Sequence, residues 1–102
     1  MSINLPVMCS LSDAEKRERE ATLLTRFKSA VVAVEELGDG YSFRLSGSSE
    51  WLALVAELLI AERECCPFLT FQLIAEPQMG AVTVRITGPE GTKEFMKATF
   101  VG

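Results

Sequence analysis

The chain has 102 residues, of which 48% are apolar and 24% are charged, and its ten basic and fourteen acidic side chains leave a net charge of −4. This length fits one small domain, and this composition argues against a disordered or collagen-like chain. The negative balance argues against a nucleic-acid partner, because such binding depends on neutralising phosphates with Lys and Arg. The sequence contains no histidine, which excludes histidine-based acid–base catalysis and imidazole metal ligands.

The N-terminal stretch Met1–Cys9 lacks the basic segment and the apolar run of a signal peptide. The longest apolar stretch, Trp51–Ala61, is too short to span a bilayer and is interrupted by Glu57. Three cysteines are an odd number, which is more typical of reduced intracellular thiols than of a secreted disulfide framework. We therefore expect a cytoplasmic protein without a membrane partner.

The first half of the chain predicts an arm, a helix and a hairpin. Residues 1–10 are expected to form a flexible arm, and residues 11–102 a single domain. Ser12 and Glu15 have the spacing of a capping box, which predicts a helix over about 13–29. Two strands are predicted at 31–37 and 41–45, joined by a turn whose Gly38 and Gly40 can adopt positive φ.

The second half predicts a helix, a hairpin and a short helix. Ser48 or Ser49 is expected to cap a helix that runs to about Glu64 and is apolar nearly all round. Such a helix is either central to the fold or packs against a partner chain. Pro67 ends it, and the remaining predictions are strands at 69–75 and 81–86, a turn at 77–80 and a helix at about 92–99.

This order predicts a two-layer α+β fold, helix–hairpin–helix–hairpin–helix, with a four-stranded antiparallel sheet. The stretch Phe43–Ser48 lines up with Val84–Pro89, since each ends a hairpin and opens a helix. If this is an internal repeat, two ββα units pair to form the sheet. The alternative is that any strand–glycine–helix junction has this appearance.

The three cysteines are the most chemically specific feature of the sequence. Cys65 and Cys66 are neighbours at the end of the second predicted helix, and Cys9 can join them only through folding. Thiolates favour soft ions such as Hg(II), As(III), Pb(II) or Cu(I), whereas structural zinc usually takes four Cys and His ligands. Glu62 or Glu64 can supply a fourth ligand, and Arg63 can offset the negative end of the helix. Buried cysteines also serve as apolar filler, and this alternative stays open.

The run Glu62–Phe71, with the sequence ERECCPFLTF, resembles a motif of short uncharacterised bacterial proteins, some of them encoded near heavy-metal resistance regulators. The stretch Cys9–Leu11 followed by a charged helix is also similar. The resemblance implies no reaction, but it supports a thiol site at Cys9, Cys65 and Cys66.

Three functions are therefore compatible with the sequence. The first is a cytosolic protein that binds a soft metal or metalloid ion through three cysteines. The second is a dimerisation or interaction module with structural cysteines, in which the apolar second helix and the sheet edge pack against a second copy to form a homodimer. The third is a thiol enzyme with a glutamate as proton donor, by analogy with carbon–mercury bond cleavage. Glu57, Glu62 and Glu64 suit that last role only if buried, and we expect them to be exposed.

Overall fold

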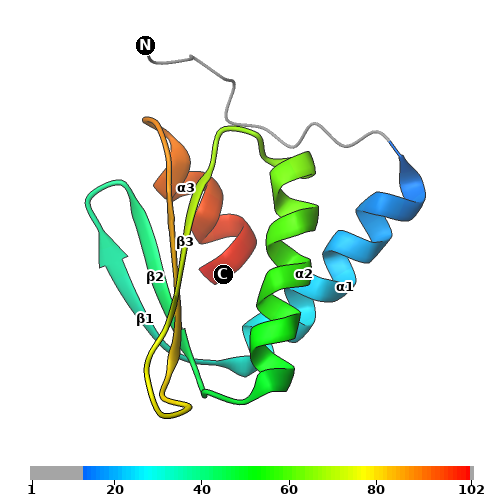
Figure 1. Cartoon of the computed structure of the whole chain (residues 1–102). Helices are drawn as coiled ribbons and strands as arrows, with labels where there is room; N and C mark the ends of the chain where they lie inside the picture. The colour runs from blue at the N-terminus through cyan, green and yellow to red at the C-terminus, as the bar shows by residue number, and fades with distance from the viewer. Residues whose placement is uncertain (1–12, 102) are drawn as a thin grey trace.

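The computed structural model describes residues 13–101, so the predicted arm at 1–10 lies outside the described residues. The described chain alternates helices and hairpins in the predicted α+β order (Figure 1). Its elements are α1 (Ala14–Ala30), β1 (Val31–Leu37), β2 (Gly40–Leu45), α2 (Ser49–Cys65), β3 (Thr70–Ala75), β4 (Val82–Thr87), α3 (Thr92–Met96) and the π-helical turn η1 (Lys97–Val101).

Helix α1 begins at a cap one residue later than the sequence predicted. The Asp13 carboxylate accepts hydrogen bonds from the backbone N–H groups of Glu15, at 2.9 Å, and Lys16, at 3.1 Å. These bonds satisfy two of the N–H groups that a helix start leaves without partners. Ser12, the predicted cap, lies outside the described residues.

The four strands form one antiparallel sheet in the order β1-β2-β4-β3. The two hairpins meet at its centre, where Phe43 of β2 is opposite Val84 of β4. Each central strand closes a hairpin and leads into a helix, as the two predicted ββα units require. Alternate side chains of the central strands are buried under the helices, whereas the edge strands β1 and β3 are mostly exposed.

An aromatic cluster joins three elements that form the core. The ring of Phe27 in α1 lies edge-on to Phe43 in β2, with centroids 5.3 Å apart, and to Phe100 in η1, at 6.4 Å. All three side chains are at most 3% exposed. The C-terminal turn therefore packs on both α1 and the sheet.

The hairpin turns differ from the prediction in their backbone conformation. Gly38 and Gly40, which the sequence allows to adopt positive φ, do not use that freedom. Gly40 is needed because a Cβ there would overlap the carbonyl oxygen of Ile86 in β4. The left-handed conformation occurs instead at Gln78 and Met79, each with φ 57°, in the predicted turn at 77–80.

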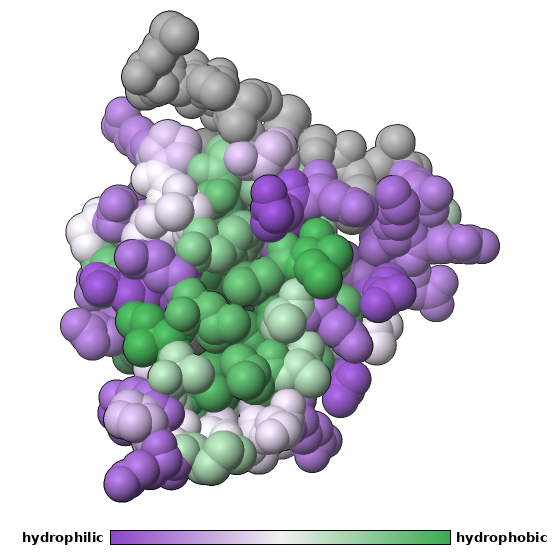
Figure 2. All heavy atoms as spheres, in the orientation of Figure 1, coloured by the Kyte–Doolittle hydropathy of each residue, from purple (hydrophilic) through white to green (hydrophobic). Residues whose placement is uncertain are grey.

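Helix α2 is buried along one side and exposed along the other. Ser48 caps it by accepting a hydrogen bond from the Trp51 N–H at 3.3 Å. Leu54, Val55 and Leu58 are at most 3% exposed, whereas Ile60 is 66% exposed. The helix is thus part of the core, and Figure 2 shows an apolar area on the face that carries α2 and β3. Among the described residues no helix is long and apolar enough to cross a membrane.

Candidate metal centre

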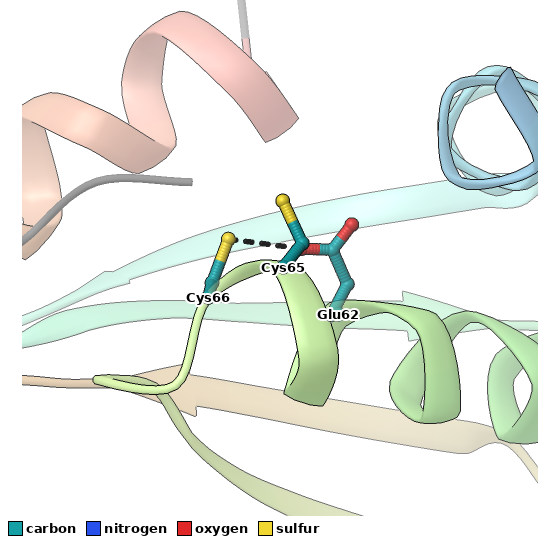
Figure 3. A group of neighbouring side chains, drawn as sticks. All are labelled: Glu62, Cys65 and Cys66. Atoms are coloured by element: carbon teal, nitrogen blue, oxygen red, sulfur yellow. Dashed lines mark hydrogen bonds between the residues drawn. The ribbon is translucent and has the colours of Figure 1, made fainter. Parts of the chain in front are cut away.

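Three potential ligands converge at the C-terminal end of α2. Glu62, Cys65 and Cys66 occupy positions i, i+3 and i+4, a spacing that brings side chains to the same side of a helix. Their ligand atoms all lie within 4.8 Å of one another, and the three side chains project from the same side of this turn (Figure 3). All three residues are buried, with exposed fractions of 0%, 3% and 1% in that order.

The Glu62 carboxyl group is only partly satisfied by hydrogen bonds. The Cys66 thiol donates to Glu62 Oε2 across 3.4 Å. Glu62 Oε1 is buried and, as an acceptor, has no hydrogen-bond partner among the described residues. A buried, unpaired polar atom is costly, so either a proton or a bound ion is expected at this oxygen.

Burial and Glu20 together raise the pKa of Glu62 to about 9 from an ordinary value of 4.5. Loss of hydration is the largest cause, followed by a hydrogen bond to the Glu20 side chain of α1 and by the charge of Glu20; the bond to Cys66 acts in the opposite direction. Two carboxyl groups can hydrogen-bond only if one is protonated. Glu62 is therefore a neutral acid near pH 7.

The same environment keeps Cys66 protonated. Burial raises the pKa of its thiol well above the ordinary range, and the charge of Glu62, the hydrogen bond to Glu62 and the charge of Glu20 add to this. Without an ion, the cluster therefore holds its protons. A cation that enters must displace them.

The two neighbouring cysteines differ in their redox state. Cys65 is disulfide-bonded, whereas Cys66 is a free thiol. The expectation of reduced thiols thus holds here for Cys66 but not for Cys65, and no disulfide joins the two neighbours. The Cys65 sulfur can act as a thiolate ligand only after reduction.

Among the described residues, Arg63 and Glu64 are not part of this cluster. Cys9 lies outside the described residues. Arg63 and Glu64 are exposed, and Glu64 forms an ion pair with Lys16 of α1 at 3.4 Å. The supporting roles predicted for Arg63 and Glu64 stay predictions from the sequence.

The expected exposure of the glutamates is wrong for Glu62 and right for Glu57 and Glu64. A signal for this was present in the sequence. Leu58, Glu62 and Cys65 follow one another at helical spacings of four and three, which places Glu62 on the same face as a buried leucine.

The fold and the cluster together define a small α+β protein with a buried thiol–carboxyl site. Two sulfur atoms and one carboxyl oxygen are a donor set that suits soft or borderline ions. Comparisons with protein-family models, with curated proteins and with solved structures found no match to this chain. The resemblance of the run Glu62–Phe71 to proteins from metal-resistance loci thus stays a prediction from the sequence.

Proposed function

We propose that this protein binds a soft metal or metalloid ion of the Hg(II), As(III), Pb(II) or Cu(I) class. In the reduced protein, the thiolates of Cys65 and Cys66 bind the ion, and Cys9 provides the third thiolate. The observation that carries the proposal is the convergence of Glu62, Cys65 and Cys66 within 4.8 Å in a buried site. Glu62 Oε1, which accepts no hydrogen bond from the described residues, is available as an oxygen ligand.

The protonation of the cluster limits which ions can bind. Binding through three thiolates must release the thiol protons of the reduced Cys9, Cys65 and Cys66, and also the Glu62 proton if that carboxyl coordinates. Only an ion with a high affinity for thiolate can overcome the raised pKa of a buried thiol. This favours soft ions over zinc, whose structural sites usually take four ligands from Cys and His.

The same property argues against the thiol-enzyme alternative. A nucleophilic cysteine needs a lowered pKa, and the pKa of Cys66 is raised. We therefore favour binding over turnover. The proposal requires a reducing compartment such as the cytoplasm, because only reduction makes the Cys65 sulfur available as a ligand.

The test is a titration of the fully reduced protein with Hg(II) and with As(III), in competition with a small dithiol chelator. We expect one ion per chain, with protons released on binding. Cys65→Ser and Cys66→Ser should each remove most of the affinity. Cys9→Ser should weaken As(III) more than Hg(II), because Hg(II) is satisfied by two thiolates.

The controls distinguish binding at this specific site from the general reaction of exposed thiols with mercury. Glu62→Gln keeps the shape of the side chain but removes a carboxylate donor, so affinity should fall by about tenfold to a hundredfold. Glu64→Gln, at an exposed position on the same helix, should bind as wild type does. Three cysteine variants that all bind like the wild-type protein would contradict the proposal and leave the cysteines as filler.

A further inference from the structure

The two edges of the sheet are very different. Strand β1 carries Glu35 and Glu36 and has an irregular register between Val31 and Ala33, and both features hinder pairing with another chain. Strand β3 (Thr70–Ala75) has no charged residue, and its register with β4 is regular throughout. Within the described residues no strand pairs with its outer side. The β3 edge is therefore open to a further strand.

An apolar groove runs beside this open edge, on the side of the sheet that the helices cover. Phe71 and Leu73 are opposite the buried Ile86 and Val84 of β4, so their side chains point to the helix side. They line the groove together with Ala56, Leu59, Ile60 and Arg63 of α2. Ile60 is 66% exposed and Leu73 is 40% exposed. This groove lies where Figure 2 shows apolar residues gathered over α2 and β3.

The charges on the exposed side of α2 are complementary to those of an antiparallel copy of the same helix. Glu57 and Arg63 lie three residues before and three residues after Ile60, and both are exposed. When two α2 helices cross in opposite directions at Ile60, Glu57 of each meets Arg63 of the other. Within the described part of the chain neither side chain has an ion-pair partner.

We propose that the β3 edge and the exposed side of α2 bind a second copy of this chain. One two-fold axis perpendicular to the sheet makes both contacts, because it pairs β3 with its copy in antiparallel fashion and places the two α2 helices antiparallel on the same side. Ile60 and Leu73 of each copy fill the apolar groove of the other copy. Two ion pairs between Glu57 and Arg63 lie on either side of this apolar contact. The sheet then continues across the interface. This proposal does not depend on the metal site.

Charge reversal tests the proposed helix pairing directly. Sedimentation and light scattering are measured in reductant, so that disulfide-linked species do not contribute. The wild-type protein should form dimers that dissociate on dilution. Glu57→Arg or Arg63→Glu places like charges opposite each other, and each should weaken the dimer by about tenfold or more. Both positions are exposed, so the variants should keep the wild-type circular dichroism.

An equimolar mixture of the two variants provides the sharper result. The arginine introduced at position 57 of the first variant then meets the glutamate introduced at position 63 of the second. The native Arg63 of the first variant likewise meets the native Glu57 of the second. The mixture should therefore form a heterodimer, detected by native mass spectrometry, although each variant alone is largely monomeric.

Substitutions on the two sheet edges identify which edge is used. Leu73→Lys on β3 should abolish the dimer, whereas Val32→Lys on β1, where the side chain is 69% exposed, should leave it intact. Backbone amides of β3 should exchange more slowly with solvent in the dimer. A protein that stays monomeric at every concentration overturns the proposal, as does a dimer that is insensitive to the charge variants or is lost in Val32→Lys.

Discussion

The buried carboxyl of Glu62 makes the stability of the folded protein depend on pH. Its pKa is about 9 in the folded protein against 4.5 in its ordinary environment. Between these two values the folded protein keeps a proton that the unfolded chain has lost. The contribution of Glu62 to the free energy of unfolding is therefore largest below about pH 4.5, falls as pH rises toward about 9, and is level above that.

Glu62→Gln should remove this pH dependence. We expect the wild-type free energy of unfolding to lose up to about 1.4 kcal/mol for each pH unit across this window, and the variant to lose much less. Urea unfolding of the metal-free protein from pH 5 to pH 9 measures the difference, with Glu64→Gln as an exposed control. Equal slopes in the wild-type protein and in Glu62→Gln would show that the carboxyl is ionised in the folded state.

The turn between β3 and β4 keeps two residues other than glycine in a left-handed conformation. Gln78 and Met79 both have φ 57°, and the Gly80 N–H donates to the Pro77 carbonyl oxygen at 3.1 Å. In two-residue hairpin turns, Asn followed by Gly adopts this conformation at lower cost. Met79 is 72% exposed, so little packing is lost when its side chain is removed.

Gln78→Asn combined with Met79→Gly should therefore raise the free energy of unfolding by about 1 kcal/mol. Chemical denaturation measures it. Met79→Ala removes the same side chain but keeps the left-handed strain, so it is the matched control and should give no gain. If the double variant is no more stable than Met79→Ala, the left-handed conformation of Gln78 and Met79 does not destabilise the protein.

At the scale of elements, α2 contributes one side to the core and leaves the other exposed. Leu58 is completely buried, whereas Ala53 on the same helix is exposed. Leu58→Asp should lower the free energy of unfolding by about 3 kcal/mol or more, because it buries an unpaired carboxyl group. Ala53→Asp makes a comparable change on the exposed side and should cost about 0.5 kcal/mol or less. Thermal unfolding compares the two, and similar melting temperatures would mean that α2 is peripheral.

Most elements were predictable because their sequences have a clear period. Alternation at 41–45 and 81–86 predicts half-buried strands, and both central strands are confirmed with bounds that differ by one residue. The side of α2 that faces the core was harder to predict, because apolar residues surround the helix nearly completely. The exposed side of α2 can be identified only once it is known which side packs against the sheet and α1.

At the scale of the whole molecule, the predicted α+β architecture is confirmed, including its four-stranded antiparallel sheet. The site was predictable only in part. Cys65 and Cys66 are neighbours in sequence, so their proximity requires no knowledge of the fold. The contact between Glu62 and Glu20 depends on how α1 packs against α2, and no local pattern contains that information. The conformations of Gln78 and Met79 are likewise imposed by the hairpin and are unusual for their residue types.

The central seam of the sheet has a consequence for how the chain folds. Each hairpin joins strands that are close in sequence and can form early, but neither hairpin alone buries the apolar side of its inner strand. That burial requires β2 to pair with β4. The pair Phe43–Val84 closes a loop in the chain that contains all of α2 and β3. Closing so long a loop is entropically costly, and the contacts that repay it form only afterwards. We therefore expect docking of the two hairpins to be the slow step of folding, and a fragment that ends before β3 to lack a stable structure of its own.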